Sequence, residues 1–187
     1  MTKRINHIGL IVGKRGTGKT TFGKEKIVAA SKMPKVLVVD TINHGMYANW
    51  PVITIDKLKY WKKGNYRLII TGDETEAALT EINTYCNNCL IIFEDAVKYL
   101  NPNLQPAVVS LFVDSKQKNI DVFLMYHEYT FVPPKVYRYT DSITVFKTKS
   151  SPFRRKNEIN MYDEVQSVWD RVKAHPSPYY CLTIETA

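Results

Sequence analysis

Short apolar segments bounded by polar and turn-forming residues recur along the chain. They are rich in β-branched and aromatic residues and lack the period-two alternation of a half-exposed strand. Continuous apolar runs of this kind are typical of strands covered on both faces, as in a parallel sheet. We expect such strands at residues 8–13, 35–40, 51–55, 66–72, 89–95, 121–127, 141–148 and 179–186.

Helix-forming segments lie between several of these strands. Helices are expected at residues 19–32, 74–85, 104–116 and 160–173, several of them with apolar side chains at helical spacing. Alternation of strands and helices predicts a three-layer α/β fold with a mainly parallel central sheet. A chain of 187 residues suits a single domain, residues 1–187, and the Pro-containing segment 149–158 is expected to be a loop within it.

The segment IVGKRGTGKTTF, between the first strand and the first helix, carries the strongest chemical signal. It fits G-x-x-x-x-G-K-[ST], the Walker A phosphate loop, in which backbone N–H groups of a glycine-rich turn surround phosphate oxygens. Lys19 is expected to reach the β- and γ-phosphates, and Thr20 to place its hydroxyl on Mg²⁺. We therefore predict a site for ATP and Mg²⁺ formed by Gly13, Lys14, Arg15, Gly16, Thr17, Gly18, Lys19, Thr20 and Thr21.

The strand expected at residues 89–95 ends in an acid pair, Glu94 and Asp95. P-loop NTPases need a carboxylate at the end of a neighbouring strand to hold Mg²⁺. In the additional-strand ATPases the next acid polarises the attacking water, so by position Glu94 would serve Mg²⁺ and Asp95 the water. The usual order is Asp then Glu, so the roles could be exchanged. The alternative without catalysis is an acid pair stabilised at a helix N-terminus.

The net charge is +8, and the basic residues are clustered. Residues 1–35 contain nine lysines and arginines against one acid, and further clusters lie at 57–67 and 147–156. Basic surfaces attract polyanions through long-range fields and counterion release. Nucleic acid is therefore the expected partner, and solvated lysines on exposed faces are the alternative.

The three cysteines are expected to be ordinary reduced thiols. Cys86 and Cys89 have CxxC spacing, but no second pair completes a zinc site, and Cys181 lies far along the chain. This favours a reducing, cytoplasmic setting. No apolar run approaches the ~20 residues of a membrane span, and the N-terminus lacks the pattern of a signal peptide.

Residues 114–148 resemble the FtsK-HerA superfamily of DNA-pumping ATPases, especially the compact genome-packaging ATPases of membrane-containing viruses and phages. In that family a basic residue ends a helix, a strand follows with a polar sensor at its end, and a short Pro-containing helix precedes another strand. The matching positions are Lys116 or Lys118, residues 121–126, His127, Pro133 with Pro134, and residues 143–147. With the two Walker motifs the resemblance covers roughly residues 6–148.

This resemblance implies an additional-strand, RecA/FtsK-like P-loop ATPase that works as a ring of identical subunits. Such a motor would move DNA, as in packaging a viral genome into a capsid, and would contact capsid or portal protein. It would act in the host cytoplasm or on the virion.

Two positions depart from the family pattern. The usual sensor Gln is His127 here, for which a hydrogen-bonded strand-end histidine is the alternative. The family's arginine finger, which reaches the neighbouring subunit's phosphates, is matched by Lys116, a point charge without the bidentate fork. Other candidates for the finger are Arg138, Arg154 and Arg155.

Two other functions remain open on the sequence. A nucleoside or nucleotide kinase shares the fold and would use residues 150–158, SSPFRRKNE, as an Arg-rich lid. The acid pair argues against it, because such kinases seldom place a water-activating acid there. A phage assembly NTPase, similar to the zonula-occludens-toxin family, would be expected to carry a membrane segment downstream, and these 187 residues contain none.

Overall fold

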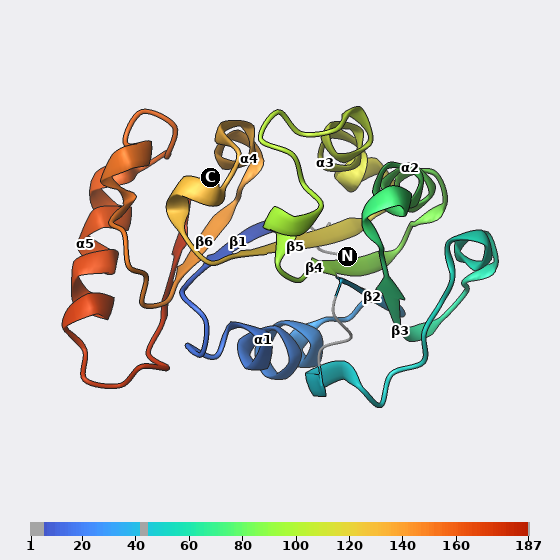
Figure 1. Ribbon diagram of the computed structural model, residues 1–187, viewed down its shortest axis with the longest axis horizontal. Coiled ribbons are helices and arrows are strands. Elements are labelled where there is room, and N and C mark those ends of the chain that lie inside the picture. Colours follow the sequence, from blue (N-terminus) through green and yellow to red (C-terminus); the bar gives the residue numbers. More distant parts are fainter. Residues whose placement is uncertain (1–5, 42–44, 187) are drawn as a thin grey trace, which may run out of the picture.

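The computed structural model describes residues 6–41 and 45–186. Within these residues, seven strands form one sheet in the order β3-β2-β4-β5-β1-β6-β7 (Figure 1). Strands β1 to β6 run parallel, and β7 runs antiparallel to β6. The strands are β1 (Ile8–Val12), β2 (Lys35–Asp40), β3 (Gly64–Ile69), β4 (Cys89–Phe93), β5 (Ile120–Tyr126), β6 (Ser142–Val145) and β7 (Leu182–Glu185).

Helices cover both faces of this sheet. One face carries α1 (Lys19–Phe22), which continues as a π-helix over Gly23–Val28 (Figure 1). The other face carries α2, α3 and α4, and α5 stands beside β6 and β7 at the end of the sheet (Figure 1). Their bounds are α2 (Thr75–Tyr85), α3 (Pro106–Lys118), α4 (Pro134–Tyr139) and α5 (Tyr162–Ala174). The expected three-layer α/β fold with a mainly parallel sheet is confirmed.

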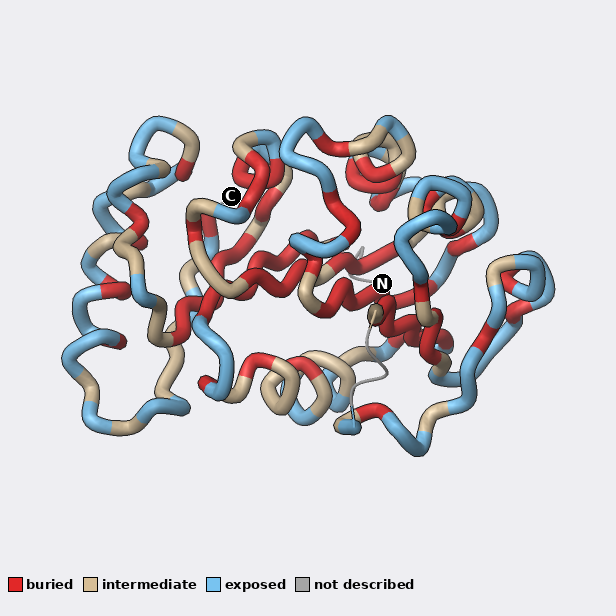
Figure 2. The backbone as a smooth tube through the Cα atoms, viewed as in Figure 1, coloured by how far each residue is buried: buried red, intermediate tan, exposed pale blue. Residues whose placement is uncertain are grey.

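The side chains of the central strands β1, β2, β4 and β5 alternate between two hydrophobic cores. In β1, Leu10 and Val12 belong to the core under α2, α3 and α5, whereas Ile11 belongs to the core under α1. Figure 2 shows the central strands as an almost continuous buried layer. Because both faces are covered, apolar residues follow one another without polar interruption, which explains the sequence pattern of the strands.

The parallel arrangement brings three loops together at one edge of the sheet. Strands β4, β5 and β1 are neighbours, with Phe93 paired to Leu124 and Val12 paired to Tyr126. The segments that follow these three strands therefore emerge side by side. In open α/β sheets, ligands bind at this carboxyl edge.

The prediction of a strand at residues 51–55 is wrong. Val52 forms only an isolated bridge with Arg67, and Ile55–Tyr60 form a 3₁₀-helix. Pro51 has no N–H to donate to a ladder. Its carbonyl accepts from the Arg67 N–H at 2.9 Å, and the Ile53 N–H donates back to the Arg67 carbonyl at 2.8 Å. The segment thus touches the edge strand β3 briefly and then turns away.

Smaller differences have local causes. Helix α3 begins at Pro106, later than expected, because the residue before a proline avoids the α-helical region, and Gln105 is extended. The loop at 149–158 contains a short 3₁₀-helix, Pro152–Arg155.

Other sequence expectations concern the cysteines, the basic cluster and membrane spans. Cys86 and Cys89 are buried free thiols, and a hydrogen bond between them together with burial raises the pKa of Cys89 far above its usual range. Of the basic cluster in residues 1–35, Lys3 and Arg4 lie outside the described residues. Among the helices of the described ranges, none has the length and apolarity that crossing a bilayer requires.

Candidate nucleotide-binding site

The phosphate loop, residues 13–20, joins the end of β1 to the start of α1. Gly16 and Gly18 have φ angles of 76° and 90°, which side chains with a Cβ rarely adopt. A hydrogen bond also joins the loop to the end of β5, because the Gly13 N–H donates to the Tyr126 carbonyl at 3.0 Å. Inside the loop, the Thr17 hydroxyl donates to the Lys14 carbonyl at 2.8 Å. The Walker A sequence therefore forms an ordered turn between a strand and a helix, as the motif requires.

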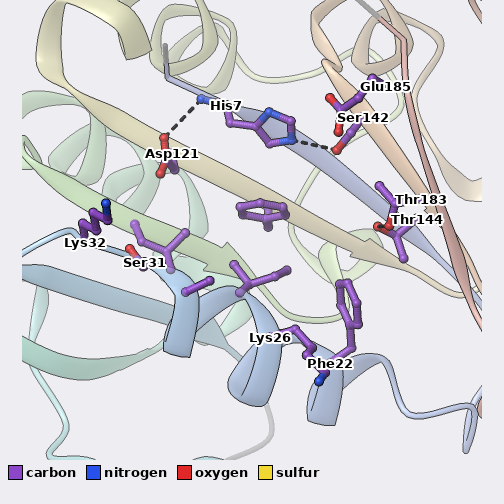
Figure 3. Close-up of a pocket in the computed structure, with 14 residues that line it drawn as sticks. His7, Phe22, Lys26, Ser31, Lys32, Asp121, Ser142, Thr144, Thr183 and Glu185 are labelled. Atoms are coloured by element: carbon purple, nitrogen blue, oxygen red, sulfur yellow. Dashed lines mark hydrogen bonds between the residues drawn. The ribbon is translucent and has the colours of Figure 1, made fainter. Parts of the chain in front are cut away.

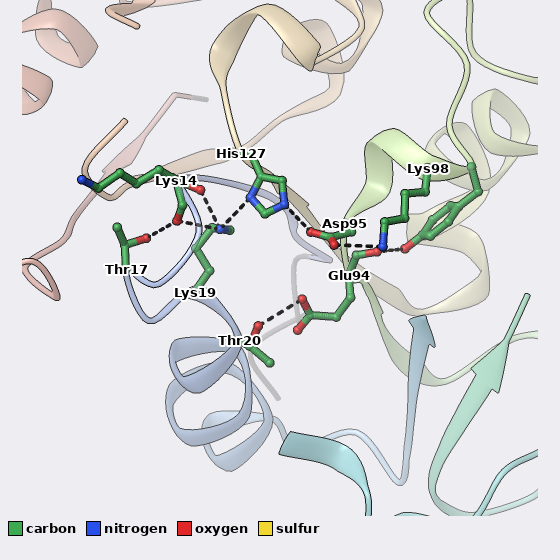
Figure 4. A network of polar contacts seen from close by, with 10 residues as sticks. Lys14, Thr17, Lys19, Thr20, Glu94, Asp95, Lys98 and His127 are labelled. Atoms are coloured by element: carbon green, nitrogen blue, oxygen red, sulfur yellow. Dashed lines mark hydrogen bonds and ion pairs between the residues drawn. The ribbon is translucent and has the colours of Figure 1, made fainter. Parts of the chain in front are cut away.

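Lys19 points its ammonium group back across the mouth of this loop. Its Nζ donates to the carbonyls of Gly13 at 2.6 Å and Lys14 at 3.2 Å, and lies 3.2 Å from His127 Nδ1 (Figure 4). Burial lowers the pKa of Lys19 to about 8, with the neighbouring acids opposing that shift. The group is still mainly protonated at neutral pH, so a cation stands where the motif places the terminal phosphates.

Glu94 directly follows β4 and faces the first turn of α1. The Thr20 hydroxyl donates to Glu94 Oε2 at 3.3 Å, and the Tyr47 hydroxyl donates to Oε1 at 3.3 Å. Burial raises the pKa of Glu94 to about 7, and the nearby Asp40 and Asp95 carboxylates add to this effect. A carboxylate this poorly solvated is suited to a compensating cation.

The oxygen atoms of Thr20 and Glu94 fit Mg²⁺, which prefers hard oxygen ligands. The described ranges contain no group of three or more His, Cys, Asp or Glu side chains able to hold a metal. In nucleotide sites, one or two protein ligands hold Mg²⁺, and phosphates and water complete its shell. Thr20 and Glu94 would hold the ion.

Asp95 and His127 form a second pair beside Lys19. His127 Nε2 lies 2.7 Å from Asp95 Oδ1, and Lys98 Nζ lies 3.3 Å from Asp95 Oδ2. The hydrogen bond with His127, reinforced by Lys98, holds the pKa of Asp95 well below its usual range. The imidazole therefore lies between the phosphate-loop cation and the acid, with Nδ1 3.2 Å from Lys19 Nζ and Nε2 2.7 Å from Asp95 Oδ1 (Figure 4).

These residues line one cleft of about 550 Å³ at the carboxyl edge of the sheet. Its wall includes the expected residues Arg15, Gly16, Gly18, Lys19, Thr20, Thr21, Glu94, Asp95 and His127. Sequence reasoning missed Asp40, Met46 and Lys98, which also line it. Asp40 had a usable signal, because it ends an apolar strand in the same way as the acid pair. Nothing in the sequence marks Met46 or Lys98.

The finger candidates lie outside this cleft. Lys116 is exposed in the last turn of α3, at the opposite edge of the sheet, where the Lys118 carbonyl accepts from Asn88 N–H at 2.9 Å just before β4. Arg138 and Arg154 are exposed. Arg155 is engaged within the chain, with Nη2 donating to the Thr130 carbonyl at 2.7 Å.

A different pocket, of about 420 Å³, lies between α1 and the sheet (Figure 3). His7 Nε2 lies 2.7 Å from the Ser142 hydroxyl on its wall, and the His7 N–H donates to Asp121 at 3.1 Å. Phe22 and Phe123 supply apolar surface. None of the residues expected to bind nucleotide or to act in catalysis lines this pocket.

The strand order, the loop after β1 and the acids after β4 define the class of fold as that of P-loop NTPases. Neither a protein-family model nor a curated protein matches the sequence. Solved structures do match, and they share this fold.

The genome-packaging NTPase B204 from Sulfolobus turreted icosahedral virus 2, in complex with AMPPCP, matches with a TM-score of 0.74 and 16% identity over 97% of this chain and 93% of that chain. The DNA-packaging ATPase B204 from Sulfolobus turreted icosahedral virus matches with a TM-score of 0.68 and 17% identity, over 97% of this chain and 94% of that chain. The cytoplasmic domain of the Thermomonospora curvata type VII secretion ATPase EccC matches with a TM-score of 0.62 and 13% identity, over 95% of this chain and 24% of that chain. The likeness to genome-packaging ATPases expected from the sequence is thus confirmed for the fold.

Proposed function

We propose that this chain is a single-domain, Mg²⁺-dependent ATPase that drives the movement of nucleic acid, most simply the packaging of viral DNA into a capsid. The observation that carries the proposal is the linked set of side chains at the carboxyl edge. Lys19, His127 and Asp95 form one connected row, and the Thr20–Glu94 pair lies beside it. This set places a cation, a metal-binding pair and a charged acid around the phosphate loop.

The proposed division of roles follows from these contacts. Lys19 binds the β- and γ-phosphates, and its charge offsets the charge that develops on them during transfer. Thr20 and Glu94 hold Mg²⁺, which neutralises phosphate charge when bound. Asp95 stays ionised because His127 and Lys98 stabilise its carboxylate. Its proposed role is therefore to orient the attacking water, and not to take up and keep a proton from that water. His127 fixes Asp95 and Lys19 relative to each other.

Nucleic acid is the proposed substrate of the motor because exposed basic residues recur around the fold. Lys57, Lys59, Lys62 and Lys63 are exposed in the segment before β3, and Lys149, Arg154 and Lys156 are exposed in the segment after β6. The test is the affinity for duplex DNA at increasing salt concentration. Phosphate contacts predict a steep linear fall of log affinity with log salt, and absence of binding at low salt would remove DNA from the proposal.

A ring of identical subunits, with Lys116 reaching the neighbour's nucleotide, is the proposed assembly. The exposure of Lys116 and its distance from its own cleft suit a contact in trans, and capsid or portal protein would be further partners. Mixing Lys19→Ala with Lys116→Ala chains tests this arrangement. Each variant alone should be inactive, and a mixture should regain part of the activity where an intact loop meets an intact finger. Full activity of Lys116→Ala alone would place the finger at Arg138, Arg154 or Arg155.

The kinase alternative is less well supported, because its lid candidate is tied down. The N–H groups of Lys149 and Ser150 donate to Glu128 at 3.1 and 3.0 Å, and Arg155 holds the Thr130 carbonyl. The discriminating experiment supplies ATP with a mixture of nucleosides and nucleotides and analyses the products. Inorganic phosphate alone supports the ATPase, whereas a newly phosphorylated nucleoside or nucleotide would support the kinase.

A further inference from the structure

Tyr179 lies against the phosphate loop, although it is distant from that loop in sequence. It belongs to the segment between α5 and β7, and a Cβ on Gly18 would come within 3.5 Å of its ring. Tyr179 is nevertheless 67% exposed, so it is open to solvent and accessible to a ligand. Figure 1 shows this red segment beside the blue loop that precedes α1.

The segment that carries Tyr179 is anchored to the same strand end as the phosphate loop. Lys147, just after β6, donates from Nζ to the His175 carbonyl, and its own carbonyl accepts from the Lys14 N–H at 2.8 Å. The ring of Tyr180 stacks on His175, with centroids 3.8 Å apart. Tyr179 and the phosphate loop are therefore held in a defined relative position through Lys147.

The strand order sets the direction in which a bound nucleotide lies. Glu94, Asp95 and His127 follow β4 and β5, on one side of β1, whereas Tyr179 precedes β7, on the other side of β1 and beyond β6. Hydrolysis takes place at the terminal phosphate, which belongs beside the acid pair. With the terminal phosphate there, the α-phosphate would lie at the opposite end of the loop, and the nucleoside would leave the loop on the side of Tyr179.

We propose that Tyr179 provides a stacking face for the purine base of the nucleotide. An exposed aromatic ring offers a π-face to a base, and such stacking accepts different bases because every base has one. The inference rests on the proposed function, because the acid pair fixes which end of the loop receives the terminal phosphate. It adds a residue that binds the base to a site otherwise built to hold phosphates.

Equilibrium binding of two probes tests this role. The probes are AMPPCP and inorganic tripolyphosphate, each with Mg²⁺, measured by calorimetry on the full chain. Tyr179→Ala should weaken AMPPCP binding about tenfold and leave tripolyphosphate binding unchanged within about twofold. Tyr179→Phe, which keeps the ring, should bind both probes like wild type. Tyr60→Ala is the matched control, since Tyr60 is 70% exposed on the 3₁₀-helix Ile55–Tyr60, beside the edge strand β3.

The outcomes separate this inference from the proposed function. Equal weakening of both probes by Tyr179→Ala would show that Tyr179 only supports the loop, and no weakening of either would remove it from the site. Both results overturn the inference and leave the ATPase proposal standing. If wild-type protein binds neither probe, the proposed function itself fails, and the inference fails with it.

Discussion

Replacing His127 by alanine should lower kcat about 100-fold and leave nucleotide affinity near the wild-type value. His127 Nε2 lies 2.7 Å from Asp95 Oδ1, and each of the two side chains is 18% exposed. A hydrogen bond to a charged group contributes about 1.5–3 kcal/mol, or about 10- to 150-fold in rate if it orients the acid only during transfer. Lys19 would keep its bonds to the Gly13 and Lys14 carbonyls, so phosphate binding should persist.

Two further variants make this prediction specific. His127→Gln should recover kcat to within about tenfold of wild type, because an amide can accept from Lys19 and donate to Asp95. Lys98→Ala removes the other partner of Asp95, at 3.3 Å and with a side chain 31% exposed. An ion pair at that exposure contributes about 0–1 kcal/mol, so kcat should fall less than about fivefold.

The assay is steady-state phosphate release, with kcat and KM fitted separately and AMPPCP affinity measured in parallel. A lower kcat at unchanged affinity indicates an interaction made in the transition state. Wild-type kcat in His127→Ala would refute the reasoning, as would a loss in Lys98→Ala equal to that in His127→Ala.

Asp95→Asn should bind ATP without hydrolysing it, whereas Glu94→Gln should lose the Mg²⁺ dependence of ATP binding. If turnover assays instead show normal hydrolysis by Asp95→Asn and none by Glu94→Gln, the roles of the two acids are exchanged. The pKa of Asp95 is lower in the folded chain than in the unfolded chain. The ionised carboxylate therefore contributes its full stabilisation above the ordinary Asp pKa near 4, and this stabilisation is lost as the pH falls below that value. Urea unfolding of Asp95→Asn should therefore show a smaller loss of stability between about pH 6 and about pH 3 than wild type, and parallel losses would contradict this. Thr20→Val should lower the affinity for Mg²⁺ with ATP, measured by metal titration, because it removes the hydroxyl that faces Glu94, and unchanged affinity would exclude Thr20 as a ligand.

Much of the fold could be predicted because burial on both faces leaves a plain sequence signal. The β4 segment is apolar throughout, and both it and its neighbours were assigned from that feature. The segment at residues 51–55 has a similar composition but begins with Pro51, and a single bridge to Arg67 is all that results. A short apolar run therefore predicts that a segment is buried. Whether that segment pairs with a neighbouring strand depends on its backbone N–H groups, which apolar composition alone does not reveal.

The candidate site was predictable where one motif contains all the residues, and less so where distant segments meet. The phosphate loop and the acid pair could each be found locally, because spacing within a few residues fixes their geometry. The contacts of Tyr47 with Glu94 and of Tyr179 with Gly18 join segments far apart in the chain. Tyrosines are common in this sequence, so nothing local distinguishes these two from the other tyrosines.

Phosphate release from Mg²⁺–ATP by wild-type and Lys19→Ala chains, with and without duplex DNA, tests the central claim most directly. Lys19 is the buried cation of the phosphate loop, and its loss removes a contact that strengthens as charge develops on the transferred phosphate. We expect hydrolysis by wild type, an increase in its rate when DNA is added, and no hydrolysis by Lys19→Ala under either condition. Turnover by Lys19→Ala within about twofold of wild type would contradict the assignment of this cleft as an ATPase site.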